Sequence, residues 1–214
     1  MRTGMLSLLY SVKLKEFQER LGEMTNTSIV YVSDLVSCSN KRVLRALYPL
    51  LTFNMEPQTL LGDLVHKGLQ HLVTTVDKQD NVEWQAEVPI ERTYVIDGKS
   101  YILKGRADLV GYEEGSPKFI VEIKTARHFH STMPLEHHIL QLKIYLELFN
   151  VDKGILIYVT PEKIAEYSVV RGGIDIEKLL RETISNTVHP RYEWECKYCP
   201  FRKLCPYALE LQQG

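Results

Sequence analysis

Hydrophobic side chains recur every three or four residues in the first third of the chain and at every second position in the middle. The first pattern predicts helices over residues 5–22, over residues 33–48 with Ser33 as the N-terminal cap, and from Pro57 to about residue 76. Between residues 82 and 125 the period is that of strands, with turns at Asp97–Gly98 and at residues 113–117. We therefore expect a helical beginning followed by a hairpin sheet.

Helical spacing returns over residues 135–149 and again near residues 174–188, with the strand-like segment GILIYVT between them. The chain then ends in a cysteine-rich segment and a short helix. Strands that have helices before and after them predict a mixed α/β fold, in which one sheet is flanked by helices. The 214 residues suit one large domain, and we expect residues 1–214 to form a single unit.

Composition narrows the class of protein. With 44% hydrophobic and 25% charged residues the chain is typical of globular proteins. The net charge of -1 does not by itself indicate nucleic acid or a membrane as a partner. No apolar run reaches the roughly 18 residues of a membrane span, and the N-terminus lacks a convincing signal-peptide cleavage site. We expect a cytoplasmic protein without a membrane partner.

The second turn brings two acidic residues together. If this turn is centred on Gly115, residues equally distant from it face each other, so that Tyr112 faces Lys118 and Asp108 faces Glu122. Like charges opposed across two strands are destabilising unless something compensates them. A divalent cation does so, and Mg²⁺ or Mn²⁺ bound to one or two carboxylates keeps water ligands.

Lys124 shares a face with Glu122, because side chains alternate along a strand. An Asp, a Glu and a Lys on one patch of sheet suit the hydrolysis of a phosphodiester: the cation activates a water, and the lysine orients that water and offsets phosphate charge. The alternative is that GRADLV and VEIKT are ordinary amphipathic strands with charges facing solvent.

Two helical pairs are candidates for the same site. Gly62 would let its helix approach the sheet, and His66, four residues later, has a side chain able to bind Mn²⁺. Gln141 and Tyr145 lie one turn apart on one face of their helix, where an amide and a phenol can position a substrate backbone. Either pair is also compatible with purely structural roles.

The four cysteines form a Cys196-x2-Cys199-x5-Cys205 group and a single Cys38 far upstream. Together they can hold one metal centre that joins the two ends of the chain. Zinc sites more often have paired knuckles, whereas Cys199–Pro200 and Cys205–Pro206 resemble the Cys-Pro pairs of ferredoxin-type cluster sites, although the ferredoxin spacing differs. We therefore favour a four-thiolate iron-sulfur cluster, with 4Fe-4S as the first choice, while the sequence leaves the number of irons open. Zinc and disulfides are the alternatives.

In order along the chain stand Cys38, GDLVH, GRAD, EIK, QLKIY and CKYCPFRKLC. This series resembles the RecB-like nucleases of the PD-(D/E)xK (restriction-endonuclease-like) fold. More specifically, it is similar to the CRISPR-associated nuclease family that is numbered fourth among the Cas proteins. The resemblance covers residues 38–205. One departure is Ser39, because the family often has a proline directly after the first cysteine.

The resemblance implies a metal-dependent DNA exonuclease that acts on single strands, typically from the 5′ end, in CRISPR spacer acquisition alongside the integrase proteins. It also implies that residues 1–56 and 189–214 form a helical cluster-binding lobe around a nuclease core of residues 57–188. By the same resemblance, the metal ligands are His66, Asp108, Glu122 and the carbonyl of Ile123. The implied catalytic residues are Asp108, Glu122, Lys124, Gln141 and Tyr145. The implied cluster ligands are Cys38, Cys196, Cys199 and Cys205.

Basic residues lie next to the cysteines on both sides of the proposed cluster. Joining the two ends of the chain would gather them onto one phosphate-binding surface, although they are also compatible with ordinary solvated charges. Nearby aromatic residues, among them Tyr192, Trp194 and Tyr198, can stack on unpaired bases or pack in the core. The predicted DNA-binding residues are Lys41, Arg42, Arg45, Arg202 and Lys203.

Two other functions compete with this reading. One is a catalytically silent iron-sulfur module that binds DNA or serves as a scaffold, and the other is a RecB-like repair nuclease whose motor is a separate chain, since this sequence has no P-loop pattern. DNA glycosylases share the C-x2-C-x5-C ending, but they have no role for the Asp, Glu and Lys set. The polarity of digestion and the oligomeric state are open at this stage.

Overall fold

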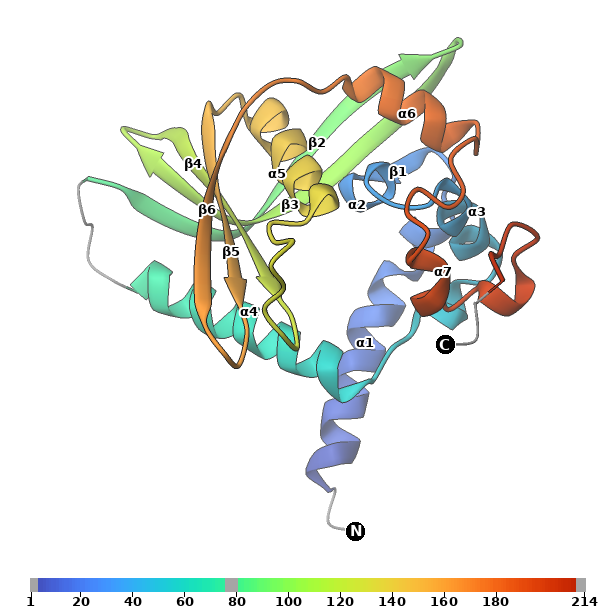
Figure 1. Ribbon diagram of the computed structural model, residues 1–214, viewed down its shortest axis with the longest axis horizontal. Helices are drawn as coiled ribbons and strands as arrows, with labels where there is room; N and C mark the ends of the chain where they lie inside the picture. The colour runs from blue at the N-terminus through green and yellow to red at the C-terminus, as the bar shows by residue number, and fades with distance from the viewer. Residues whose placement is uncertain (1–3, 76–80, 211–214) are drawn as a thin grey trace.

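The computed structural model of the chain describes residues 4–75 and 81–210 (Figure 1). Its elements are α1 (Met5–Thr25), β1 (Ile29–Tyr31), α2 (Val32–Leu35), α3 (Ser39–Leu47), the 3₁₀ helix η1 (Pro49–Thr52), α4 (Pro57–Thr75), β2 (Glu83–Ile96), β3 (Lys99–Glu113), β4 (Ser116–Thr125), α5 (Glu136–Phe149), β5 (Lys153–Val159), β6 (Ile164–Val170), α6 (Ile176–Ile184), α7 (Glu195–Tyr198) and η2 (Arg202–Leu204). The predicted mixed α/β fold is confirmed.

Six strands form one mixed sheet in the order β1-β3-β4-β5-β6, with β2 paired to the free side of β3. β1 runs parallel to β3 and β4 parallel to β5, whereas the other pairs are antiparallel. β3 is therefore the central strand. One of its edges carries β2 along almost its whole length, and the other edge carries β1 at residues 102–104 and β4 at residues 109–113.

The predicted hairpin register is confirmed where it matters for the site, and wrong at the turn. Leu109 pairs with Val121, and the next two pairs follow the same register around Gly115. A bulge at Gly111 and Tyr112 then shifts the register, so that Tyr112 faces Pro117 and not Lys118. The turn itself is the two-residue loop Glu114–Gly115, both with positive φ (48° and 78°), which is shorter than the predicted five-residue connection.

Helices cover both faces of the β4–β5 part of the sheet (Figure 1). On one face, Leu69 and Val73 of α4 pack against Leu109, Val121 and Ile123. On the other face, α5 contributes fully buried Leu142, Ile144 and Leu146 to the larger core. α6 lies beside the β2–β3 hairpin, where Arg181 forms an ion pair of 2.6 Å with Asp97. The sheet therefore lies in the middle of three layers.

The second predicted helix is divided in two. α2 ends at Leu35 and α3 begins at Ser39, so Cys38 stands at the N-cap of α3. The predicted cap Ser33 is wrong, because the helix begins one residue earlier and the Tyr31 N–H is bound by the Asp34 carboxylate at 2.9 Å. Residues 29–31 form a strand that the hydrophobic pattern did not predict, and β6 is a second such strand.

Val30, Val32 and Leu35 lie in the same core as Leu142 and Leu156. The predicted division of the chain assigned residues 1–56 to a separate cluster-binding lobe. The packing shows that β1 and α2 belong with the sheet, so the division at residue 56 does not follow the core.

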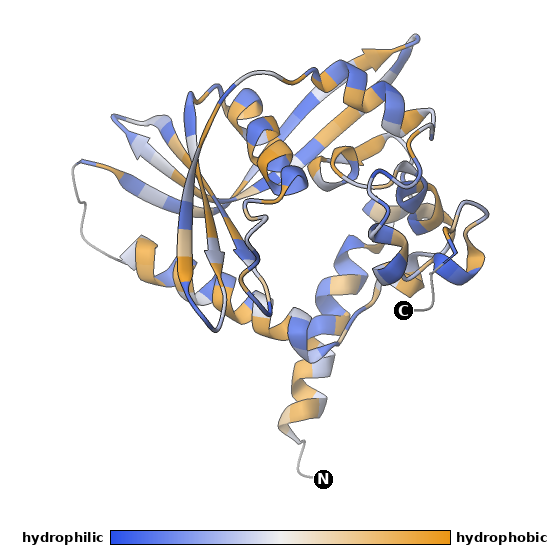
Figure 2. Ribbon diagram, in the orientation of Figure 1, coloured by the Kyte–Doolittle hydropathy of each residue, from blue (hydrophilic) through white to orange (hydrophobic). Residues whose placement is uncertain are grey.

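Parts of the apolar faces of α1 and α4 are exposed, although Leu69 and Val73 of α4 pack on the sheet. Met5 and Leu6 are 70% and 75% exposed, and Figure 2 shows the apolar first half of α1 projecting from the rest of the chain. Leu61, Leu64 and Leu72 of α4 are also exposed. In residues 4–75 and 81–210, no helix combines the length and the hydropathy needed to cross a membrane.

Candidate functional site

The site lies at a gap in one edge of β3. Between the residues paired with β1 and those paired with β4, residues 105–108 have no strand partner on that edge in the described part of the chain. The Tyr145 hydroxyl fills this gap, because it accepts a hydrogen bond from the Arg106 N–H (3.2 Å) and donates one to the Arg106 carbonyl (3.1 Å). A Cβ atom at Gly105 would lie 2.6 Å from the Tyr145 ring, so this close approach requires glycine.

Asp108 is the residue at the end of the gap. Its Oδ2 accepts the Ile123 N–H at 2.7 Å, which replaces a ladder bond between β3 and β4. Its Oδ1 lies 3.4 Å from His66 Nδ1. The Asp108 carbonyl accepts a hydrogen bond of 3.2 Å from Gln70 Nε2, which also binds Glu87 (2.6 Å). The carboxylate is thus fixed by both α4 and β4.

His66 reaches Asp108 from α4, and the predicted role of Gly62 in this approach is supported. A Cβ atom at Gly62 would lie 3.1 Å from Thr125 Oγ1 at the end of β4. The hydrogen bond to Asp108 raises the pKa of His66, while burial opposes the shift. The imidazole therefore lies against a carboxylate, as a residue that shares a cation with it would.

Glu122, Lys124 and Gln141 form a closed triangle of contacts. Lys124 Nζ lies 2.7 Å from Glu122 Oε1 and 3.0 Å from Gln141 Oε1, and Gln141 Nε2 donates to Glu122 Oε1 at 2.8 Å. Glu122 is buried, and its second oxygen, Oε2, has no hydrogen-bond partner. Burial raises the pKa of Glu122, the charge of Asp108 adds to the rise, and Lys124 opposes it. Neighbouring strands thus hold two mutually repelling carboxylates.

These contacts place the predicted residues as follows. Asp108, Glu122, Lys124, His66 and Gln141 come together, as predicted. Tyr145 lies at the same place, but its buried hydroxyl is committed to the Arg106 backbone, so it supports the GRAD segment and is not free to bind a substrate backbone. Gln141 is likewise bonded to Glu122 and Lys124.

An open cleft of about 1140 Å³ leads from solvent to this site. α1 forms one wall and is tied across the cleft by the Lys13–Asp63 ion pair to α4 (2.6 Å) and by the Lys104–Glu23 ion pair to β3 (2.9 Å). His66 and Asp108 line the cleft directly. A polymer can therefore reach Asp108 and His66 between α1, α4 and the sheet.

The donor set at this site fits a hard divalent cation. Carboxylate oxygens are the ligands that Mg²⁺ and Mn²⁺ prefer, and an unpaired buried oxygen beside a second carboxylate is costly without a cation. Within the described residues, no three His, Cys, Asp or Glu side chains are gathered into a ready-made site for one metal ion. Glu122 is turned toward Lys124 and Gln141, and only its Oε2 is unpaired.

The predicted meeting of Cys38 with the C-terminal cysteines is observed. All four are free thiols and line one small cavity, and the Asn40 side-chain amide donates to Cys205 Sγ at 3.3 Å. Burial raises the pKa of Cys38 and of Cys199. No disulfide joins these residues in the described structure, so that alternative has no support.

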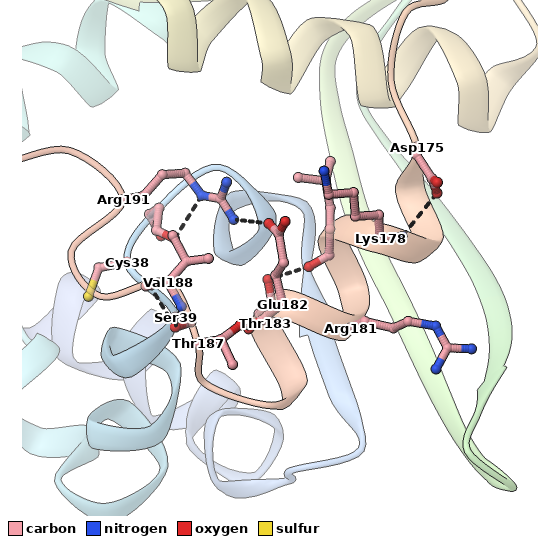
Figure 3. A network of polar contacts seen from close by, with 12 residues as sticks. Cys38, Ser39, Asp175, Lys178, Arg181, Glu182, Thr183, Thr187, Val188 and Arg191 are labelled. Atoms are coloured by element: carbon pink, nitrogen blue, oxygen red, sulfur yellow. Dashed lines mark hydrogen bonds and ion pairs between the residues drawn. The ribbon is translucent and has the colours of Figure 1, made fainter.

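Ser39 explains how the chain departs from the family pattern after its first cysteine. Its N–H donates to the Val188 carbonyl at 2.8 Å, and its hydroxyl donates to the same carbonyl at 2.7 Å. A proline has no N–H and cannot form the first of these bonds. Figure 3 shows Cys38 and Ser39 beside Val188 and Arg191, where the segment after α6 is fastened to the start of α3.

Glu195 is a structural residue at this junction that the sequence prediction missed. Its side chain is 2% exposed and forms an ion pair with Lys41 (2.9 Å). It also accepts the N–H groups of Cys38 (2.9 Å), Arg191 (3.0 Å) and Tyr192 (3.0 Å). Burial acts to raise the pKa of Glu195, but Lys41 and the backbone N–H groups outweigh it and lower the pKa. Its position directly before Cys196 was the only signal in the sequence.

Most of the residues predicted to bind DNA are engaged inside the protein. Arg42 is buried and donates a hydrogen bond to the Thr27 carbonyl. Both terminal nitrogens of Arg45 donate to the Asp34 carboxylate (2.6 and 2.8 Å). Lys41 is paired with Glu195. This geometry argues against phosphate binding by Arg42, Arg45 and Lys41, because each would have to break these contacts. Arg202 bonds to the Leu209 carbonyl, and Lys203 is exposed.

Comparisons with known proteins agree with the fold and identify the family. The sequence model of the PD-(D/E)XK nuclease superfamily matches residues 78–206, more than half of the chain. The sheet, the Asp–Glu–Lys set and this match define a PD-(D/E)XK nuclease, a class of enzymes that use divalent metal ions.

A relative from Saccharolobus solfataricus, named CRISPR-associated exonuclease Cas4, is 37% identical over 199 residues, which are 91% of this chain and 96% of that protein. The crystal structure of SSO0001 superposes with a TM-score of 0.84 at 36% identity, over 98% of this chain and 100% of that chain. An alkaline exonuclease from Laribacter hongkongensis has a TM-score of 0.48 at 13% identity, over 88% of this chain and 98% of its own. The chain belongs to the Cas4 family of CRISPR-associated exonucleases and is a hydrolase.

Proposed function

We propose that this exonuclease hydrolyses single-stranded DNA from the 5′ end with Mn²⁺ or Mg²⁺ at the gap in β3. The observation that carries the proposal is the pair Asp108 and Glu122, held on adjacent strands with one carboxylate oxygen unpaired and an ammonium 2.7 Å from the other. The two carboxylates repel each other, and Lys124 pairs with only one oxygen of Glu122, so a second cation beside Glu122 Oε2 and Asp108 would remove a cost that the protein alone does not offset.

Each residue of the site has a role in this proposal. Asp108, Glu122, His66 and the carbonyl of Ile123 would hold the cation. When bound, the cation would lower the pKa of a water and polarise the phosphate. Gln141 keeps Lys124 beside Glu122, where the ammonium can orient the attacking water and offset phosphate charge. Tyr145 holds the Arg106 backbone, and thereby Asp108, in place.

The four cysteines would hold an iron-sulfur cluster, in this proposal of the 4Fe-4S type. The shared cavity, the free thiols and the amide of Asn40 directed at Cys205 support this assignment. Zinc is the alternative ligand. A brown protein with visible thiolate-to-iron absorption and stoichiometric iron favours the cluster, whereas a colourless protein that contains zinc contradicts it. The cluster-binding lobe would be formed by residues 1–56 and 189–214, within which β1 and α2 also pack on the sheet.

The cellular role belongs to the same proposal. The relative's name places that protein in a CRISPR system, and a nuclease that shortens single strands from one end suits the trimming of DNA fragments before spacer integration. Integrase proteins would be the partners, and the cytoplasm, where thiols stay reduced, would be the compartment.

The experiment is cleavage of labelled DNA by the purified, cluster-loaded protein in Mn²⁺. Single strands carrying a label at the 5′ or the 3′ end report polarity, and a circular single strand reports whether an end is needed. Asp108→Asn, Glu122→Gln and Lys124→Met are each expected to reduce the rate at least about 100-fold. Glu166→Gln, an exposed carboxylate on β6, is the matched control and is expected to keep the wild-type rate.

Full activity in any of the three site variants would overturn the catalytic assignment. Release of label from the 3′ end first would overturn the polarity. Tight DNA binding without any cleavage in Mn²⁺ or Mg²⁺ would favour the silent scaffold over the nuclease.

A further inference from the structure

The face of α5 that carries Gln141 and Tyr145 continues for one more turn to His137. Residues 137, 141 and 145 are spaced by four, so their side chains lie on one side of the helix. The rise between His137 and Gln141 is about 6 Å. The helix therefore leads from the catalytic triangle directly to His137.

His137 contacts the segment that precedes the C-terminal cysteines. Its ring centroid lies 5.0 Å from that of Trp194 and 5.5 Å from that of Tyr192. The Tyr192 and Trp194 rings are almost parallel, with an interplanar angle of 15°. These three rings form one cluster between α5 and the N-terminal end of α7. The cluster connects the helix that carries Gln141 to the segment that carries the C-terminal cysteines.

The outer side of α7 extends this cluster into solvent. Trp194 is 47% exposed and Tyr198, four residues later, is 71% exposed. Lys197 lies over the Tyr198 ring, 5.6 Å from its centroid. Glu195 and Cys196, on the inner side of the same turn, are buried. The single turn of α7 therefore has a buried side at the cysteine cavity and an exposed side that is aromatic and basic.

We propose that Trp194, Tyr198, His137 and Lys197 form a stacking platform for unpaired nucleobases of the strand that enters the nuclease site. This inference rests on the proposed function, and names a binding subsite for its substrate. Aromatic faces bind bases of any identity, and a nearby cation contributes to backbone binding, which is the usual pattern for single-stranded nucleic acid. The platform begins at His137, one helical turn or about 6 Å from Gln141, and extends outward through Trp194, whose ring centroid lies 5.0 Å from that of His137.

Bases, and not only phosphates, should contribute to binding here, because Glu136 and Glu193 stand beside the aromatic rings in sequence and reduce the local positive charge. A strand without bases should therefore gain little from the platform. That difference separates stacking from general electrostatic attraction.

The test measures the affinity of cluster-loaded protein for two strands of equal length, one with normal bases and one abasic, without added divalent metal so that neither is cleaved. Trp194→Ala is expected to weaken binding of the base-bearing strand roughly 5- to 150-fold and to leave the abasic strand unchanged. Trp194→Phe keeps a ring and should restore most of the affinity. Tyr198→Ala removes an exposed ring and should weaken binding without affecting the fold.

Tyr48→Ala is the matched control, because Tyr48 is 45% exposed and lies at the end of α3, outside the platform. An equal loss of affinity for both strands in Trp194→Ala, or no loss in either Trp194→Ala or Tyr198→Ala, would overturn the platform. Cleavage by the wild-type protein in Mn²⁺ is measured separately. If the wild type cleaves and the Trp194 variants bind normally, the platform fails and the nuclease assignment stands; if the wild type does not cleave, the proposed function fails.

Discussion

Replacing Glu195 by alanine should lower the stability of the protein, because this side chain joins the start of α3 to the segment before the C-terminal cysteines. The carboxylate is almost completely buried and receives four donors: the Lys41 ammonium and the backbone N–H groups of Cys38, Arg191 and Tyr192. Two of these donors belong to the N-terminal part of the chain and two to the C-terminal part. The Glu195→Ala variant leaves all four without their acceptor.

The expected cost follows from the burial of this group. Removing one partner of a buried ion pair costs about 3–5 kcal/mol, since the remaining charge is uncompensated. Lys41 is 28% exposed, so its ammonium can partly rehydrate, which favours the lower half of that range. Water can enter the space left by the side chain and accept from the freed N–H groups, so we add no more than about 1 kcal/mol for them. We therefore expect a loss of about 3–5 kcal/mol, and a fall in Tm of roughly 6–20 °C for a chain of this size.

The assay is thermal unfolding followed by circular dichroism, together with visible absorption by the cysteine-bound centre. Glu195→Gln keeps one acceptor oxygen and should fall between the wild type and Glu195→Ala. Glu193→Ala is the control, because Glu193 is exposed two residues away and should change stability by no more than about 0.5 kcal/mol. A Tm of Glu195→Ala within about 2 °C of the wild type would refute the reasoning.

The pH dependence provides a second check on Glu195. Its pKa is lower in the folded state than its ordinary value, so its contribution is present above the unfolded pKa of about 4.3 and is lost as the pH falls through the folded pKa. The difference in stability between the wild type and Glu195→Ala should therefore shrink in acid. A difference that stays constant from neutral pH down to about pH 2 would contradict the role of the charged carboxylate.

Three further changes test other parts of the site. Cys38→Ser should abolish visible absorption and bound iron while the sheet still folds; undiminished iron would show that Cys38 is not a ligand. Tyr145→Phe should lower stability by about 1–3 kcal/mol in urea unfolding, because two hydrogen bonds to Arg106 are lost, and should slow cleavage; unchanged stability would mean that the β3 gap does not need the hydroxyl. Because burial raises the pKa of Glu122, the metal-free wild type should lose stability relative to Glu122→Gln as the pH rises above about 4.3; a Tm difference independent of pH between 5 and 8 would contradict this.

The sequence predicted the catalytic strands well because their geometry is local. Symmetry around Gly115 predicted the register of Leu109 with Val121, and hence the proximity of Asp108 and Glu122. The two-residue turn alone would give a register shifted by one residue. The bulge at Gly111 and Tyr112 compensates for that shift. The register predicted at the site is therefore correct, but it depends on a bulge and not on the five-residue turn that was assumed.

Long-range contacts explain what the sequence did not predict. The helix predicted over residues 33–48 is interrupted before Cys38, whose N–H is bound by Glu195, 157 residues away. Arg42 and Arg45 look like free basic residues in the sequence, yet the first bonds to backbone carbonyls and the second to Asp34. Hydrophobic periodicity carries no information about such partners, because each is set by how distant segments pack.

The unpaired edge of β3 at residues 105–108 determines where the site residues lie. A continuous strand partner along residues 105–108 would satisfy every backbone group there, and would also cover the edge from which the cleft reaches the sheet. In its place, the Tyr145 hydroxyl binds the Arg106 backbone and the Asp108 carboxylate binds the Ile123 N–H, so two side chains replace ladder bonds. Asp108 is thereby held at the end of β4 beside Glu122 and Lys124, while His66 approaches from the cleft. Because the side chains that close the gap also fix Asp108, a loss of fold and a loss of catalysis should accompany each other at Tyr145, whose hydroxyl bonds to the Arg106 backbone.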